Sequence, residues 1–285
     1  MLDTGTRTHW IATVKTITSR QHPFVSRCRA AARGRSIDAN EILLDGIHLL
    51  EEAVEAHVVI ETAAFTTAAA QSSEGGLLAA RLDAGGTHVL TVSDAVMEAL
   101  SPVRTPTGVV AIGRHASCPL GHVFAPPPAL VVGIAGVQDP GNVGAIIRVA
   151  EAAGATGVVV TDGSANPFGW KALRGAMGSA FRIPVAAGIA VAVLLDAARS
   201  HGTRRFATVP AGGVELSACD LTSASLVLVG SEGHGLDADT IQAADERLHI
   251  SMATRVESLN VAVAAGVILF EARRQRTAHT RACAR

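Results

Sequence analysis

The chain has 285 residues, of which 48% are hydrophobic and 3% aromatic, and its formal net charge is -1. A chain of this length and apolar content can bury one large core or two medium ones, so two domains are the first expectation. The near-neutral balance gives no global sign of nucleic-acid binding, which leaves local clusters of cations as the only sites for a polyanion.

Positive charge is concentrated near the two ends of the sequence. Up to residue 36, a single acid, Asp3, stands against seven basic residues: Arg7, Lys15, Arg20, Arg27, Arg29, Arg33 and Arg35. After Glu271 the chain adds five arginines and no acid. Two basic ends on a neutral body can bind phosphate, although such arginines can also be solvated and bind nothing in particular.

Neither a metal site nor a disulfide framework is predicted. Cys28, Cys118, Cys219 and Cys283 are far apart and form no CxxC pair, and the eleven histidines are scattered along the chain. The first ten residues lack the apolar stretch of a signal peptide, and no apolar run approaches the length of a membrane span. We therefore expect a soluble cytoplasmic protein with no membrane partner.

The N-terminal part of the sequence predicts a small α/β domain. Its expected elements are a basic helix from Pro23 to about Gly34, a helix at 47–56, strands at 58–65, 88–92 and 108–114, and a helix from about Asp94. The Ala-, Ser- and Gly-rich residues 66–76 are compatible with either a loop or a weak helix.

Three consecutive prolines at 126–128 indicate a domain boundary, because three fixed φ angles without backbone donors make a stiff connector. The predicted organisation is an N-terminal domain at 1–125, a linker at 126–128 and a C-terminal domain at 129–285. In the C-terminal domain strands are expected at 129–137, 157–161, 181–186, 205–209, 225–230 and 247–252, with helices near 142–153, 169–179, 190–201 and 237–244. This alternation is typical of a parallel sheet covered on both faces.

The last predicted helix, at about 258–274, has an unusual composition. Between Val261 and Phe270 it carries no charged or strongly polar side chain, so we expect protein to cover it on all sides. Ser258 and Asn260 lie in its first turn, where main-chain N–H groups lack intrahelical partners. A functional site is therefore expected at the start of this helix.

Two further loops follow apolar strands, and in parallel α/β sheets ligands bind where strands end. In the loop at 138–144, Asn142 is placed to cap the next helix, and Arg148 lies six residues on; a capped helix with a solvated arginine is the plain alternative. The loop at 230–235 contains three glycines and Glu232, but it matches neither GxGxxG nor Walker A. His234 is interpreted as a surface residue.

Together these loops resemble a known family. DPGNVGAIIRVAEAAGA (139–155), LVLVGSEGHGLD (226–237) and LHISMATRVESLNVAVAAGVILFE (248–271) are similar, in order, to the three motifs of the SpoU/TrmH RNA ribose 2′-O-methyltransferases. NPFGWKALRGAMGSAFRIPV (166–185) resembles the segment between the first two motifs. Upstream, ITSRQHPFVSRCRAAAR, LLDGIHLLEEA and TPTGVVAIGR look like the small substrate-binding domain of many members.

The resemblance implies a fold and partners. The C-terminal domain would be an α/β parallel-sheet domain of the SPOUT superfamily with a deep trefoil knot, and the N-terminal domain a smaller, ribosomal-protein L30e-like α/β domain. The enzyme would act as a homodimer, with the helix from 258 threaded through the knot and packed on a second subunit. S-adenosylmethionine would be the cofactor, contacted by Gly230, Ile250 and Leu259, with Met252 adjacent.

The resemblance also implies an active site made of Asn142, Arg148, Glu232, Ser258 and Asn260. Asn142, Ser258 and Asn260 can position the substrate, and Glu232 can hold a neighbouring Asn or Arg. Because a guanidinium stays protonated at ordinary pH, Arg148 is expected to stabilise a developing alkoxide rather than to act as a base. The chain departs from many members in having Ala176 two residues after Arg174, where they have Ser.

The function implied is S-adenosylmethionine-dependent 2′-O-methylation of structured RNA, with 23S ribosomal RNA favoured. The N-terminal arginines Arg20, Arg27, Arg29, Arg33 and Arg35 would bind the RNA, since phosphate contacts position a protein without reading sequence. Three alternatives stay open: a transfer RNA substrate, protection of ribosomes against an antibiotic through the same reaction, and a non-catalytic RNA-binding protein that keeps the fold.

Overall fold

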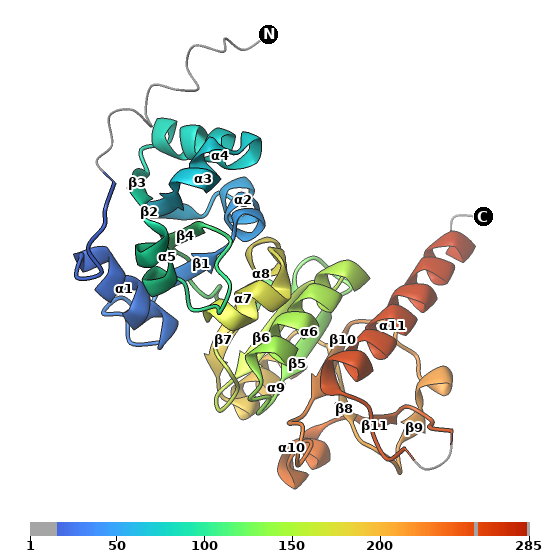
Figure 1. Cartoon of the computed structure of the whole chain (residues 1–285). Coiled ribbons are helices and arrows are strands. Elements are labelled where there is room, and N and C mark those ends of the chain that lie inside the picture. Colours follow the sequence, from blue (N-terminus) through green and yellow to red (C-terminus); the bar gives the residue numbers. More distant parts are fainter. Residues whose placement is uncertain (1–15, 254–255, 284–285) are drawn as a thin grey trace. The chain divides into compact units, whose positions relative to one another are not determined.

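The computed structural model describes residues 16–253 and 256–283, and Figure 1 labels their helices and strands. The chain divides into two compact units. The first contains the described part of Met1–Ala116 together with Phe168–Arg174, and the second contains Ser117–Pro167 and the described part of Gly175–Arg285.

This division departs from the boundary expected at 126–128. Residues 117–125 belong to the second unit because Val123 and Phe124 are buried in its core and Thr156 Oγ1 donates a hydrogen bond of 2.7 Å to the Val123 carbonyl. Phe168–Arg174 belongs to the first unit, where Trp170 packs against the core and Arg174 Nη1 lies 3.8 Å from Asp45 Oδ1. Main-chain stiffness at the prolines says nothing about which core the neighbouring side chains enter.

The first unit is an α/β domain, as expected. Its sheet has the strand order β1-β4-β2-β3, with β2 and β3 parallel and the other pairs antiparallel. The strands are β1 Glu41–Asp45, β2 Val59–Thr66, β3 His88–Val92 and β4 Val109–Arg114, and the helices are α1 Pro23–Ala32, α2 Ile47–Glu55, α3 Thr67–Gln71, α4 Ser73–Ala84 and α5 Asp94–Leu100. Strand β1 is absent from the predicted elements, because a short apolar run fits a strand and a buried helix equally.

The Ala-, Ser- and Gly-rich residues 66–76 form helices rather than a loop. Thr66 Oγ1 accepts a hydrogen bond from the Ala69 N–H at the start of α3, and Ser72 Oγ accepts one from the Gly75 N–H at the start of α4. These two hydroxyls satisfy N–H groups that have no partner within the helix. Capping therefore decides a segment whose composition is ambiguous.

The second unit contains a seven-stranded sheet in which every pair of neighbours is parallel, in the order β7-β6-β5-β10-β8-β11-β9. Its strands are β5 Leu130–Ile134, β6 Gly157–Thr161, β7 Val185–Ile189, β8 Arg204–Thr208, β9 Val214–Glu215, β10 Ser225–Val229 and β11 Glu246–His249. The remaining elements of this unit are α6 Pro140–Ala153, α8 Ser179–Arg182, α9 Val191–Ser200, α10 Ala238–Ala243, α11 Val261–Cys283 and the short 3-10 helices η1 Leu120–Phe124 and η2 Leu216–Ala218, whereas the helix α7 Trp170–Ala176 belongs to the first unit up to Arg174. The α/β fold with a parallel sheet is confirmed.

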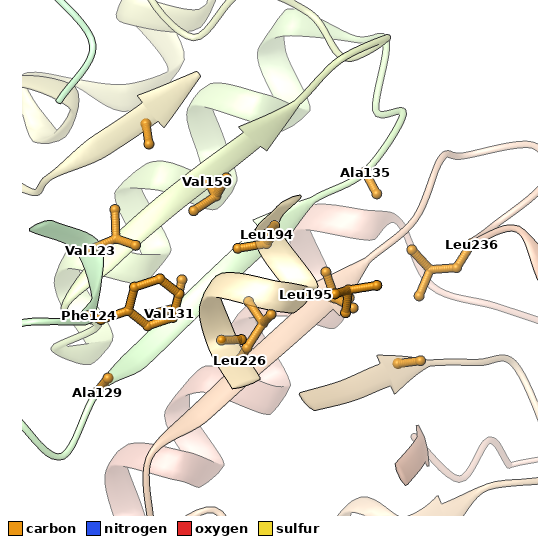
Figure 2. Close-up of a cluster of buried hydrophobic side chains, with 14 residues drawn as sticks. Val123, Phe124, Ala129, Val131, Ala135, Val159, Leu194, Leu195, Leu226 and Leu236 are labelled. Atoms are coloured by element: carbon orange, nitrogen blue, oxygen red, sulfur yellow. The ribbon is translucent and has the colours of Figure 1, made fainter. Parts of the chain in front are cut away.

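One face of this sheet is covered by α9 and η1 (Figure 2). Leu194 and Leu195 of α9 and Phe124 of η1 are buried against Val131 and Leu226 of the central strands. Each fully buried side chain of this size contributes roughly 1.5–3 kcal/mol relative to exposure. The packing fixes the sheet whose strand ends carry the predicted loops.

The helix α11 is not covered on all sides, so that expectation is wrong for the single chain. Its buried face contains Ala265, Ile268, Leu269 and Ala272, and the helix packs against α6. On the other face Val263, Val267 and Phe270 are 52%, 41% and 50% exposed. Apolar composition indicates that a face has to be covered, but it does not say that the same chain covers it.

Candidate active site

A hydrogen-bonded network joins the three predicted loops through Asn142, Glu232 and Asn260. Asn142 Nδ2 donates to Glu232 Oε1 at 2.8 Å, and Asn260 Nδ2 donates to Asn142 Oδ1 at 3.1 Å. Glu232 also accepts longer bonds, both 3.4 Å, from the main-chain N–H groups of Gln138 and Asp139. The structure thus brings together three of the five residues predicted for catalysis.

The start of α6 explains why Asn142 is free to enter this network. The helix is capped by Asp139, whose Oδ1 accepts from the Asn142 N–H at 2.9 Å, and Pro140 occupies the first turn. The expectation that Asn142 itself caps the helix is therefore wrong. Because Asp139 satisfies the main-chain donor, the carboxamide of Asn142 is available for Glu232.

Asn260 has two roles at the start of α11. Its Oδ1 accepts from the N–H groups of Ala262 and Val263 at 3.0 and 3.3 Å, while its Nδ2 is directed to Asn142. A carboxamide can accept and donate at the same time, so one side chain both begins the helix and joins it to the first turn of α6. The sequence position predicts a role in the first turn, and the partner comes from the tertiary fold.

Among the described residues, neither Arg148 nor Ser258 forms a hydrogen bond with this network. Both residues are exposed, and neither side chain has a hydrogen bond or ion pair within the part of the chain that the structure describes. Arg148 lies on α6, six residues after Asn142, and its guanidinium is therefore available for an anionic ligand. Their catalytic roles remain predictions.

Glu232 is held as a carboxylate. Partial burial acts to raise its pKa, but the hydrogen bonds from Asn142 and from main-chain N–H groups outweigh this effect, and the pKa lies below its ordinary value. An ionised carboxylate can only accept hydrogen bonds. Glu232 therefore orients the Asn142 amide group, whose oxygen is then directed to Asn260.

The four positions predicted to contact the cofactor lie in the loop after β10 and in the stretch between β11 and α11. Gly230 begins a tight loop in which Ser231 and Gly235 exchange two main-chain hydrogen bonds of 3.0 Å. A Cβ atom at Gly230 would lie 2.2 Å from the Gly235 carbonyl carbon, so no other residue fits there. Ile250, Met252 and Leu259 are half-buried and lie outside any described helix or strand.

The same strand ends form a pocket of about 560 Å³ that the sequence does not predict. It is lined by Gln138 after β5, by Thr161 at the end of β6 and Asp162 directly after it, by residues 231–237 after β10, and by Val191 at the start of α9. Glu232 belongs to both the pocket and the network, whereas none of the four positions predicted for the cofactor lines it. A polar pair at the end of β6 is the signal that could have indicated it.

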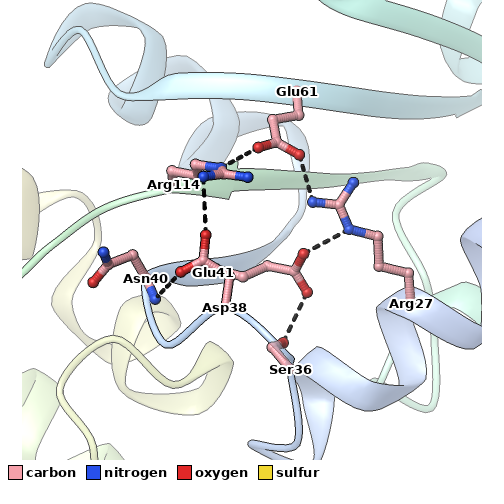
Figure 3. Close-up of polar contacts among 7 residues, drawn as sticks. All are labelled: Arg27, Ser36, Asp38, Asn40, Glu41, Glu61 and Arg114. Carbon is pink, nitrogen blue, oxygen red and sulfur yellow. Dashed lines mark hydrogen bonds and ion pairs between the residues drawn. The ribbon is translucent and has the colours of Figure 1, made fainter.

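Among the N-terminal arginines, Arg27 is held within a network of ion pairs (Figure 3). Its Nε donates to Glu41 at 2.6 Å and its Nη2 donates to Glu61, which also pairs with Arg114. Burial acts to lower the pKa of Arg27, and the two carboxylates more than compensate. The charge of Arg27 is thus largely neutralised by its own domain.

The other predicted RNA-binding arginines differ in their contacts. Arg20 pairs with Glu98 at 3.2 Å, and Arg29 Nε donates to the Ala99 carbonyl at 3.2 Å. Arg33 and Arg35 are exposed, and their side chains have no partner among the described residues. Sequence alone does not separate the arginines that stabilise the first unit from those that are free.

One group of potential metal ligands lies in the first unit. His48, Glu51 and Glu74 place ligand atoms within 4.8 Å of one another on the surface. The sequence does not predict this group because Glu74 comes from a different helix. Exposed groups of this kind are common without a metal.

A search of the helices within residues 16–253 and 256–283 finds none with the length and hydropathy of a membrane span.

Known proteins resemble the chain over both units. The model of the SpoU rRNA methylase family matches residues 129–270, and that of the MRM3-like substrate-binding domain matches residues 32–111. A tRNA/rRNA methyltransferase of Synechocystis sp. is 35% identical over 270 residues, which are 93% of this chain and 96% of the relative. The 23S rRNA guanosine 2′-O-methyltransferase RlmP of Bacillus subtilis is 30% identical and covers 82% of this chain and 89% of its own.

Solved structures agree with these matches. An AdoMet-bound rRNA methyltransferase of Sinorhizobium meliloti superimposes with a TM-score of 0.81 at 31% identity, covering 92% of this chain and 98% of its own. The SpoU methyltransferase AviRb of Streptomyces viridochromogenes in complex with AdoMet gives 0.78 at 28% identity, covering 90% and 99%. With the three motifs joined in one network, the chain belongs to the SpoU rRNA methylase family of RNA methyltransferases.

Proposed function

We propose that this protein transfers a methyl group from S-adenosylmethionine to a ribose 2′-hydroxyl of structured RNA, with 23S ribosomal RNA as the favoured substrate. The observation that carries the proposal is the network Asn142–Glu232–Asn260, in which side chains from three family motifs are already joined. A network of this kind holds donors and acceptors in place before the substrate arrives, as an active site requires.

The residues present fit the cofactor. When bound, S-adenosylmethionine supplies an electrophilic methyl group on a sulfonium. Gly230, Ile250, Met252 and Leu259 would hold it, since the loop at Gly230 has no room for a side chain and residues 250–253 and 256–259 lie outside helices and strands. An adenine ring can be recognised there by main-chain N–H and C=O groups, which explains why side-chain chemistry is sparse at these positions.

The chemistry proposed for the network is positioning and charge stabilisation. In an in-line displacement the bond from the methyl carbon to the ribose oxygen would form as the carbon–sulfur bond breaks; the sulfur would keep that electron pair as a neutral thioether, and the hydroxyl proton would pass to solvent. Asn260 and Ser258 would position the ribose, and Glu232 would fix the amide of Asn142. The exposed guanidinium of Arg148 would stabilise the developing alkoxide and bind the adjacent phosphate.

Binding of the RNA is proposed for the first unit. The MRM3-like substrate-binding domain matches residues 32–111, and Arg33 and Arg35 carry charges that no described acid neutralises. Phosphate contacts of this kind orient the RNA, and the 2′-hydroxyl distinguishes RNA from DNA, which lacks it. Arg20, Arg27 and Arg29 would contribute less, because each already has a partner within the unit.

A homodimer with a knotted C-terminal domain is part of the proposal. Val263, Val267 and Phe270 follow one another at i, i+4 and i+7 and are half-exposed on one face of α11. A second copy that covers this face would remove three large apolar side chains from water. Covering this face would complete the burial that the composition of α11 predicts.

A cytoplasmic location would fit a ribosomal RNA substrate.

The test has two parts. The purified protein is titrated with S-adenosylmethionine, and 2′-O-methyl sites are mapped in ribosomal and transfer RNA from cells with and without the gene. We expect binding, together with a ribosomal RNA site that disappears with the gene and returns with wild type but not with Arg148→Ala. A lost site in transfer RNA would instead identify the first alternative substrate. Absence of cofactor binding would favour a non-catalytic RNA-binding protein.

A further inference from the structure

The pocket beside Glu232 is assigned no role by the proposed chemistry. It lies at the ends of β6, β5 and β10, which are neighbours in the sheet. Because Glu232 takes part in the catalytic network and also lines the pocket, a group bound there would lie next to the reacting ribose. The pocket therefore has the location required for another part of the same nucleotide.

The lining of the pocket suits a flat heterocycle with a polar edge. Ala135 and Leu236 are buried and Val191 is half-buried, so these side chains provide an apolar surface. Asp162, Gln138 and His234 are exposed at its rim, and within the described part of the chain their side chains make no hydrogen bond. An unstacked RNA base is recognised in this way, by apolar contacts on its faces and hydrogen bonds at its edge.

The charge of the pocket lining favours a base over a phosphate as the occupant. The pocket contains the carboxylates of Asp162, Glu232 and Asp237 and contains neither Lys nor Arg. Such a site repels a phosphate group. Asp237 is already engaged, because its carboxylate accepts hydrogen bonds from the main chain and hydroxyl of Thr240, and Glu232 is engaged with Asn142. Asp162 is the carboxylate that is left to select a ligand.

We propose that this pocket receives the base of the nucleotide that is methylated and that Asp162 makes it selective for guanine. An ionised carboxylate only accepts, and guanine offers two adjacent donors, N1–H and N2–H, on its Watson–Crick edge. Gln138 has an amide that can donate to the guanine O6. The inference rests on the proposed function, and it adds the identity of the base and a residue that determines it.

The experiment uses the full-length protein, total RNA from cells that lack the gene, and S-adenosylmethionine with a labelled methyl group. Labelled RNA is digested to nucleosides, and we expect the label in 2′-O-methylguanosine. Asp162→Asn should lower kcat/KM for this RNA roughly 10- to 100-fold, the effect of one good bidentate base contact, and leave the Kd for S-adenosylmethionine within about twofold. Asp196→Asn, which removes an exposed carboxylate on α9, is the matched control and should change neither value.

A second measurement separates base selection from a structural effect. A transcript that carries the mapped site is compared with one that has adenosine at the target position. Wild type should prefer guanosine, whereas Asp162→Asn should shift the preference toward adenosine, since a carboxamide offers one donor and one acceptor to the adenine edge. A variant that had lost its fold would lose activity on both transcripts without such a shift.

Three results would overturn the inference while leaving the proposed function intact. They are label in a nucleoside other than 2′-O-methylguanosine, wild-type kinetics for Asp162→Asn, and weakened cofactor binding by that variant, which would make the cofactor the occupant of the pocket. If wild type transfers no label to any RNA, the proposed function itself fails and the inference fails with it.

Discussion

Asn142 Nδ2 donates a 2.8 Å hydrogen bond to Glu232 Oε1 and thereby joins the first turn of α6 to the loop after β10, 90 residues further along the sequence. Because the Asn142 oxygen in turn accepts from Asn260, the orientation of one carboxamide depends on the carboxylate on one side and on the first turn of α11 on the other. The bond places side chains from three separate motifs in one fixed arrangement.

We expect Glu232→Gln and Asn142→Ala each to lower the rate of methyl transfer by roughly 10- to 100-fold, since the first replaces one of two accepting oxygens by an NH2 donor and the second removes the amide that positions the site. The combined variant should lose less than the product of the two effects, because both changes break the same interaction. Single-turnover rates measure this. Glu55→Gln, an exposed residue of α2, is the control; additive losses would contradict a shared role.

Gly230→Ala should abolish tight binding of S-adenosylmethionine. A Cβ atom at this position would meet the main chain of Gly235 and Leu236 at 2.2–2.3 Å, so the loop after β10 has to shift. Calorimetric titration gives the Kd, and circular dichroism reports whether the fold is kept. Gly121→Ala is the matched control, since nothing lies within 4 Å of its added methyl group. An unchanged Kd for Gly230→Ala would remove this loop from the cofactor site.

Val267→Arg and Phe270→Arg should convert a dimer to a monomer. Each places a charge in the exposed apolar face of α11, and a buried unpaired charge is strongly unfavourable. Light scattering coupled to gel filtration gives the mass. Val193→Arg, on α9, changes a valine of similar exposure, 53%, and should leave the mass unaltered. A wild type of monomer mass at micromolar concentration would argue against the proposed interface.

Asp245→Asn should destabilise the second unit by about 1–3 kcal/mol, because it leaves the guanidinium of Arg205, which is 10% exposed, without its charged partner. Urea titration measures the free energy of unfolding. Asp196→Asn is the control: its pair with Arg199 is exposed on both sides and should contribute less than about 1 kcal/mol. Equal effects of the two variants would contradict the role of burial.

The same pair predicts a dependence of stability on pH. The hydrogen bond from Arg205 holds the pKa of Asp245 below its ordinary value. A carboxyl with a depressed pKa stabilises the fold above the pKa of the unfolded chain, about 3.9, and loses this contribution as pH falls through the lower folded value. Wild type should therefore lose more stability than Asp245→Asn as the pH falls from roughly 5 to 3. Parallel pH profiles would contradict it.

Much of the architecture follows from the sequence by itself. Alternating apolar runs and helical periods are local properties, so they predict six of the seven strands of the parallel sheet and most of the first unit; the two-residue strand β9 is too short to give a pattern, and the strand expected at 181–186 lies at Val185–Ile189 instead, after the helix α8. The motif residues Asn142, Glu232 and Asn260 could be selected in the same way, because each stands at the end of a strand or the start of a helix.

Only the tertiary structure decides which of these residues meet. The cap of α6 is Asp139 rather than Asn142, Arg27 is neutralised by Glu41 and Glu61, and Asp162 lines a pocket with residues 231–237. The partners of Arg27 and Asp162 lie too far along the chain for a local pattern to identify them. Asp139 and Asn142 are both residue types that cap helices, so a local pattern does not choose between them. The exposed face of α11 has the same cause: periodicity measures how apolar a surface is, whereas packing determines what covers it.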